Sequence, residues 1–175
     1  TVHENGTIEH SNQWINTGRG IFPNFQFVRE LKKALYDRGS IFRYANHENS
    51  ILNTIYNQLQ QSSEPDKQTL CEWIKTITKS KSDGAEKWEG ARNMIDLLEM
   101  VKKYYYHPIT NGSNSLKYVL PAILNASNYL KEKYSKPIYG TEIKSYNYKK
   151  QTWITFDSDN NVVNPYKLLP PINFG

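Results

Sequence analysis

A short apolar run that ends in an acid constrains the fold of this chain more than any other feature. Residues 94–96 read Met-Ile-Asp, and a basic and aromatic stretch follows at residues 102–106. A Gly-Ser turn at Gly112 then leads into a second apolar run. This order is typical of a strand end, a helix and a turn that faces a phosphate. It predicts a strand that ends at Asp96 and a helix over residues 97–105, with one continuous helix from Trp88 as the alternative.

Length, charge and cysteine content limit the class of protein. The 175 residues suit one domain, and the net charge of +5 favours polyanionic partners, although a solvated basic surface would give the same balance. The single cysteine, Cys71, excludes an internal disulfide framework and fits a reducing compartment. No apolar run approaches the roughly 20 residues that span a bilayer. We therefore expect a cytoplasmic protein without a membrane span, present here as a piece of a longer chain because it lacks an initiator Met.

Two short strand-like runs flank Asn5-Gly6 near the start of the chain. Asn-Gly between such runs is the strongest local signal for a β-hairpin. His3 and His10 would then be either exposed hairpin residues or a metal-binding pair, and no further ligand spacing supports the metal site.

An acid that directly follows a predicted strand is the first candidate for chemistry. Residues 41–45 read as a strand, and apolar residues from Ile51 to Leu59 then recur at helical spacing, so Glu48 falls in the first turn of a helix. A carboxylate at the carboxyl end of a strand can hold a hard divalent cation. The alternative is a first-turn Glu that the helix dipole stabilises.

The remaining helices follow from apolar spacing and from capping residues. Asn24 is a good N-cap and Gly39 a good stop for a helix through residues 27–35. A further helix covers residues 70–77. Within it, Cys71 is better explained as a core residue than as a nucleophile. Residues 80–90 are polar and flexible in character. Residues 116–124 form a helix strained near Pro121, and Asn125 caps another over residues 126–134.

The end of the chain favours a hairpin. Residues 153–156 alternate like a strand, residues 157–161 favour a turn, and residues 162–163 return as a partner strand. Asp157 and Asp159 could be a catalytic pair after this strand, but Asp-Ser-Asp-Asn-Asn is typical turn chemistry.

Lysines, tyrosines and serines in the middle of the chain are candidates for binding nucleic acid. Basic side chains would contact phosphates and a tyrosine ring would stack on bases, whereas a solvated helix face beside core tyrosines is the alternative. The candidates are Lys102, Lys103, Tyr105, Ser113, Ser115 and Lys117.

Five segments together resemble an uncharacterised bacterial domain family. They are residues 39–49, the Asp96-Leu97 pair, residues 105–108, residues 112–122 and residues 164–171. The family is placed in the DnaQ-like exonuclease group of the RNase H-like superfamily. The Gly-Ser-Asn-Ser-Leu-Lys segment that begins at Gly112 is the most specific part of the resemblance.

The resemblance implies an α/β fold with an RNase H-like mixed sheet flanked by helices, incomplete in this chain, and a 3'-5' exonuclease-type hydrolase. Such enzymes hold two Mg²⁺ or Mn²⁺ ions with four carboxylates. One ion generates hydroxide, and both stabilise the displacement at phosphorus. Glu48 matches one metal ligand, and Asp96 matches a supporting acid. The Asp-x-Glu of the first strand is expected before Thr1 and the last helix after Gly175.

Two hypotheses of different classes remain open. The first is the middle portion of a DnaQ-like nuclease domain that acts on DNA or RNA, with residues 1–175 alone inactive. The second is a non-catalytic module on the same fold that binds nucleic acid or protein. In either case an open sheet edge could pair with a second copy.

Overall fold

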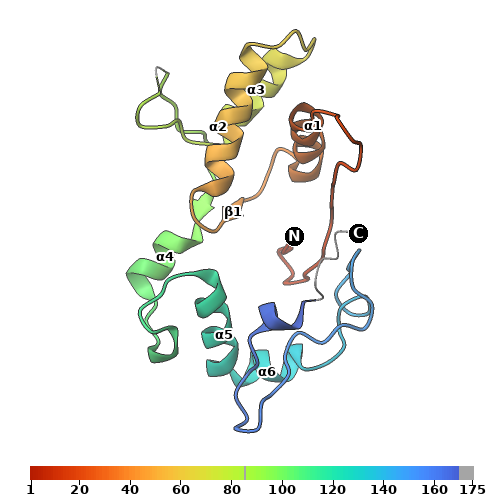
Figure 1. The fold of residues 1–175 in the computed structure, drawn as a ribbon, viewed down its shortest axis with the longest axis vertical. Helices are drawn as coiled ribbons and strands as arrows, with labels where there is room; N and C mark the ends of the chain where they lie inside the picture. The colour runs from red at the N-terminus through yellow and green to blue at the C-terminus, as the bar shows by residue number, and fades with distance from the viewer. Residues whose placement is uncertain (85, 170–175) are drawn as a thin grey trace. The chain divides into compact units, whose positions relative to one another are not determined.

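The computed structural model describes residues 1–84 and 86–169, and in these residues helices joined by loops predominate over short strands (Figure 1). The chain divides into two compact units. The middle unit comprises Trp14–Lys103, and the split unit comprises Thr1–Gln13 together with Tyr104–Gly175. The model therefore shows a mixed helix and strand protein.

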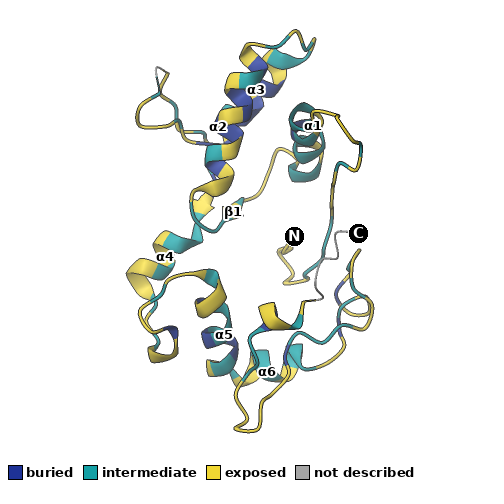
Figure 2. Cartoon of the chain, viewed as in Figure 1, coloured by how far each residue is buried: buried dark blue, intermediate teal, exposed yellow. Residues whose placement is uncertain are grey.

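Three helices build the core of the middle unit. They are α1 (Asn24–Leu35), α2 (His47–Gln60) and α3 (Lys67–Ile77). Apolar residues on α2 and α3 face each other and are buried, as the dark blue stripe on these helices in Figure 2 shows. Leu59, Ile74 and Ile77 are completely buried there. Cys71 belongs to the same cluster, and burial raises the pKa of its thiol, so its predicted core position is confirmed.

A small parallel sheet connects the helices of this unit. Strand β1 (Phe42–Arg43) pairs with β2 (Ile95–Asp96), with Phe42 opposite Ile95 and Arg43 opposite Asp96. Helix α4 (Leu97–Tyr104) follows β2 directly. The strand that ends at Asp96 and the helix after it are thus confirmed, and the alternative of one helix from Trp88 is wrong. The first strand is shorter than the predicted residues 41–45.

Two predicted helix boundaries in the middle unit are wrong. Pro23 is the N-cap of α1, whereas Asn24 is its first residue and donates a side-chain hydrogen bond of 2.8 Å to the Oε1 atom of Gln58. The helix ends at Leu35, before the predicted stop at Gly39. The guanidinium of Arg92 holds the segment that leaves α1, because it donates to the carbonyl oxygens of residues 35, 36, 38 and 39, the first of which is the last residue of the helix.

The two ends of the polar segment at residues 80–90 lie together against the end of α3. Lys79 and Glu89 form an antiparallel bridge, and the indole of Trp88 donates to the hydroxyl of Thr78 over 3.0 Å. Gly90 lies against the end of α3, where its amide donates to the carbonyl oxygen of Thr78 over 2.9 Å. The two ends of this segment are therefore part of the packed unit.

The split unit contains α5 (Leu116–Ala126), α6 (Asn128–Tyr134) and two short 3-10 helices, η1 (Pro108–Thr110) and η2 (Pro165–Leu168). Pro121 lies inside α5, as predicted. Ser127, and not Asn125, caps α6 through a bond from the amide of Leu130. The side chain of Asn125 instead accepts from the amide of Val162.

Two predicted hairpins exist as single bridges within the described residues. Val2 pairs with Ile8 around the Asn5-Gly6 turn, and Phe156 pairs with Val162 around the turn that begins at Asp157. The mixed sheet expected from the sequence is represented, within residues 1–84 and 86–169, by the β1–β2 pair. Residues 170–175, which include the last two positions of the family resemblance, lie outside the described residues.

Candidate functional site

Glu48 lies where the sequence predicted it. It is in the first turn of α2, shortly after β1, and its side chain is exposed. It also lines a cavity of about 400 Å³ whose other walls are His47 and apolar residues of α1, α2, the end of α3 and the segments around the two strands, Phe42 and Ile51 among them. Within the part of the chain that the structure describes, the Glu48 carboxylate makes no hydrogen bond or ion pair. It is therefore free to bind a cation or a donor from a ligand.

Asp96 has a different environment, because its carboxylate joins the two segments that leave the sheet. Its Oδ1 atom accepts from the amide of Ala45 over 2.9 Å and from the amide of Leu98 over 3.0 Å. Its Oδ2 atom lies 3.4 Å from the guanidinium of Arg43, and the two side chains are only 15% and 11% exposed. The bond from the amide of Ala45 holds the connection between β1 and α2, and the bond from the amide of Leu98 caps the start of α4. Asp96 is thus an anchor for both helices.

The contacts of Arg43 explain how the β1–α2 connection turns. Its guanidinium also donates to the carbonyl oxygen of Ala45 over 3.1 Å and to the side chain of Asn46 over 2.6 Å. Ala45 has a φ of 73°, a backbone conformation that a residue with a side chain seldom adopts. Both Asp96 and Arg43 hold this residue, so the geometry that places Glu48 at the start of α2 depends on them.

Metal-binding chemistry is limited within the described residues. No group of three or more His, Cys, Asp or Glu side chains that could hold a metal ion occurs in residues 1–84 and 86–169. His3 bonds to Glu9 over 2.9 Å, and the ring of His10 packs edge-on against Tyr146. Asp157 accepts from the amides of Asp159 and Asn161, so it is a turn residue as its sequence context favoured.

The predicted nucleic-acid residues on α4 and just after it differ in accessibility. Lys102 and Lys103 are both exposed, and Lys102 is paired with Glu99 over 2.8 Å. The hydroxyl of Tyr105 is buried without a hydrogen-bond partner among the described residues, and burial raises its pKa. The neighbouring Tyr104 and Tyr106 are 81% and 82% exposed. These two rings are more accessible to bases than that of Tyr105.

The other predicted nucleic-acid residues belong to the split unit. The hydroxyl of Ser113 accepts from the amide of Ser115 over 3.3 Å, and Ser115 is the residue that precedes α5. The side chain of Lys117 is exposed in the first turn of α5. Ser113, Ser115 and Lys117 therefore lie at the start of α5 and in the segment before it, while Lys102 and Lys103 lie in the middle unit.

Two asparagines of α2 were not identified from the sequence. The Asn49 side chain accepts from the amide of Lys79 over 2.9 Å and donates to its carbonyl oxygen over 3.0 Å. Asn53 donates to the same carbonyl oxygen and to that of Asn49, and both residues are buried. Their spacing of four residues on an apolar helix face was the available signal, because buried amides need partners.

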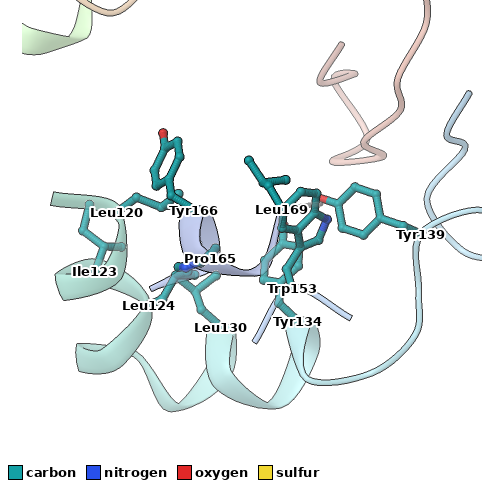
Figure 3. Close-up of a pocket in the computed structure, with 10 residues that line it drawn as sticks. All are labelled: Leu120, Ile123, Leu124, Leu130, Tyr134, Tyr139, Trp153, Pro165, Tyr166 and Leu169. Atoms are coloured by element: carbon teal, nitrogen blue, oxygen red, sulfur yellow. The ribbon is translucent and has the colours of Figure 1, made fainter. Parts of the chain in front are cut away.

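A second cavity lies within the split unit. It has a volume of about 490 Å³ and is lined by apolar and aromatic residues of α5, α6 and η2, with Tyr139 and Trp153 on one side (Figure 3). Within residues 1–84 and 86–169, the buried indole nitrogen of Trp153 has no hydrogen-bond partner. Burial raises the pKa of Tyr139. The lining offers apolar contact but no carboxylate or imidazole for acid–base chemistry.

No helix in the described part of the chain is long and apolar enough to cross a membrane.

Comparison with known proteins identifies the family of the chain but not its activity. No curated protein sequence and no solved structure matches the chain. A family model described as "Domain of unknown function (DUF2779)" matches residues 1–115, which is more than half of the 175 residues and includes both Glu48 and Asp96. The chain therefore belongs to the DUF2779 family.

Proposed function

We propose that this chain is part of a metal-dependent nuclease domain of the DnaQ-like, RNase H-like type that acts on DNA or RNA in the cytoplasm. Glu48 is the residue assigned to the metal, which would be Mg²⁺ or Mn²⁺. The supporting observation is a free, exposed carboxylate in the first turn of a helix that follows a parallel strand, beside a cavity. A hard divalent cation is bound by such oxygen atoms.

The proposal gives Asp96 a positioning role. Both of its oxygen atoms are already engaged, by the amides of Ala45 and Leu98 and by Arg43. A carboxylate in this arrangement fixes the backbone before Glu48 rather than binding an ion. This role agrees with the supporting acid that the family resemblance expects at Asp96.

The described residues do not form a complete two-metal site. They contain one free carboxylate at the sheet and no cluster of three potential ligands. A site that stabilises both the attacking and the leaving oxygen needs two ions and several carboxylates. The proposal therefore assigns the remaining ligands to other parts of the protein, and residues 1–175 alone should not cleave nucleic acid.

A cleavage assay tests this assignment. Residues 1–175, and any longer natural protein that contains them, would be incubated with a labelled single-stranded oligonucleotide and Mg²⁺ or Mn²⁺. We expect no degradation by residues 1–175 and metal-dependent degradation by the longer protein. Glu48→Gln should reduce that rate by at least about 100-fold, because it removes an ion that stabilises the transition state.

Asp96→Asn is the matched comparison. It should lower the melting temperature, because it leaves the Arg43 guanidinium without its counter-ion, whereas Glu48→Gln should leave the melting temperature unchanged. Degradation by residues 1–175 that disappears in Glu48→Gln would contradict the incomplete site. Degradation by the longer protein that is unaffected by Glu48→Gln would contradict the role of Glu48.

A non-catalytic module that binds nucleic acid is the second candidate. The exposed rings of Tyr104 and Tyr106 beside the exposed Lys103 favour it, because such residues stack on bases and contact phosphates. This candidate predicts oligonucleotide binding without degradation in every protein that contains the chain. The binding should weaken as salt rises, by a log–log slope of about −0.7 for each contacted phosphate on a single strand.

A further inference from the structure

A groove of about 660 Å³ lies between α1 and α3, within the middle unit and separate from the cavity beside Glu48. Helix α1 contributes Lys32 and Lys33 to it, and Tyr36 follows at the end of the helix. Helix α3 contributes Thr69 and the largely buried Trp73 to the facing wall. The groove therefore combines aromatic rings with basic side chains.

Tyr36 is strained and exposed at the same time. Its φ is 48° and its ψ is −157°, close to a backbone region that is almost restricted to glycine. The guanidinium of Arg92 holds it there by donating to its carbonyl oxygen over 2.8 Å. The ring gains little from burial, because the residue is 72% exposed. Strain that burial does not offset is found at ligand-binding positions.

Lys32 is the cation of this groove that makes no salt bridge within the described residues, although its charge helps to lower the pKa of Asp66. Arg29 is paired with Glu64 and Asp66, and Lys33 is paired with Glu30. Lys32 makes no hydrogen bond or salt bridge within the described residues. Lys32 and Tyr36 both line the groove, although Tyr36 follows the last residue of α1. Asp37 and Asp66 also line the groove, against the three cations Arg29, Lys32 and Lys33, so its formal charge is +1 and limits the negative charge that a ligand can bring there.

We propose that the groove between α1 and α3 binds single-stranded nucleic acid, with a base stacked on Tyr36 and a backbone phosphate at Lys32. The choice of ligand rests on the proposed function, and the site is additional to Glu48. Stacking on an exposed ring and contact of a lysine with a phosphate are the two interactions by which proteins bind single strands without reading their sequence.

Fluorescence anisotropy with labelled oligo(dT) and oligo(rU) of about 12 nucleotides tests the proposal. The chelator EDTA is present, so that binding is measured without cleavage. We expect Tyr36→Gly to weaken binding about 5- to 150-fold, which corresponds to the free energy of stacking one base, about 1–3 kcal/mol. The melting temperature should not fall, because glycine relieves the backbone strain. Tyr36→Phe should restore most of the affinity, since it keeps the ring.

Two further variants test whether binding depends on this groove or on charge and exposed aromatic rings in general. Lys32→Ala should reduce the slope of log affinity against log salt by about 0.7, as expected for one phosphate on a single strand. Tyr129→Ala removes a ring that is 67% exposed on α6 and should leave binding unchanged. An absence of salt-dependent binding by the wild-type chain, or an unchanged affinity in Tyr36→Gly, would overturn the proposal. Since no metal is needed, the outcome is independent of the cleavage assay for Glu48.

Discussion

At the scale of single residues, Gly90 shows how closely two backbone segments approach in the middle unit. A Cβ atom placed on Gly90 would lie 2.2 Å from the carbonyl oxygens of both Lys75 and Thr76. These atoms belong to the backbone of α3 and cannot rotate away. Any side chain at this position therefore has to displace the segment that leads into β2.

Gly90→Ala should destabilise the protein by about 3 kcal/mol or more, because it forces a backbone shift in a packed region. Gly39→Ala is the matched control: it has a φ of +82° but nothing within 4 Å of the added carbon. Its cost should be about 1 kcal/mol, from backbone strain alone. Urea unfolding measures both, and equal midpoints for the two variants would contradict the close approach at Gly90.

The position of Glu48 could be predicted, but the contacts of Asp96 could not. The change from strand spacing to helical spacing before Ile51 is a local signal, and it predicts that Glu48 lies in the first turn of a helix. The amide that binds Asp96 belongs to Ala45, which is 51 positions away. The four carbonyl oxygens that bind Arg92 likewise lie more than 50 positions away. Such partners depend on tertiary structure and leave no periodic pattern.

At the scale of elements, Pro121 leaves one carbonyl oxygen of α5 without its helical partner. Proline has no amide hydrogen, so the carbonyl oxygen of Lys117 lacks the usual bond from four positions later. The side chain of Asn164 donates to this oxygen over 3.2 Å and at the same time accepts from the amide of Tyr166. The proline thus creates an attachment point for the segment that begins η2.

A double-mutant cycle tests this attachment. Asn164→Asp keeps the acceptor for Tyr166 but removes the donor to Lys117, and it should cost about 1 kcal/mol. In a Pro121→Ala background, the restored helical amide binds the carbonyl oxygen of Lys117, so the same change should cost less. Chemical denaturation of the four proteins gives the coupling free energy. A coupling of zero would show that Asn164 does not respond to Pro121.

An ion pair between α1 and the start of α3 makes stability depend on pH. The hydrogen bond from Arg29 lowers the pKa of Asp66 below its ordinary value of 3.8. A carboxyl with a lowered pKa in the folded state stabilises the protein above its unfolded pKa, and this contribution is lost as the pH falls through the folded pKa. The contribution is therefore complete at neutral pH and disappears in acid.

Arg29→Gln should lower the free energy of unfolding at pH 7 by less than about 1 kcal/mol, because Asp66 and Glu64 are 38% and 34% exposed and water screens the pair. The difference from the wild type should shrink as the pH falls below about 4. It should also shrink in 1 M salt at pH 7. Denaturation curves across this range measure it, and a difference that grows in acid would contradict the assignment.

At the scale of the whole molecule, the core of the middle unit is contained in one continuous segment. The buried cluster extends from Val28 to Met94, and the half-buried residues that pack against it lie between Phe25 and Trp88. The sequence did not reveal this division, because no change in composition marks Trp14 or Lys103. The apolar spacing of α1, α2 and α3 predicts each helix, but not which parts of the chain pack together.

Residues 14–103 alone should fold and unfold cooperatively, since they contain every member of this cluster. Gly90→Ala should destabilise this segment by the same amount as it destabilises residues 1–175. Circular dichroism during urea unfolding measures both. A non-cooperative transition in the isolated segment would show that the middle unit needs residues outside it.

The division of the split unit has a consequence for synthesis on the ribosome. Glu9 pairs with Lys144, and the amide of His10 donates to the carbonyl oxygen of Lys144 over 2.9 Å. About 40 residues separate Lys103 from Lys144, so at a translation rate of ~5–20 residues per second Lys144 is added about 2–8 s after the middle unit is complete. During this interval Thr1–Gln13 has no partner strand, and a chaperone or a neighbouring nascent chain can reach it.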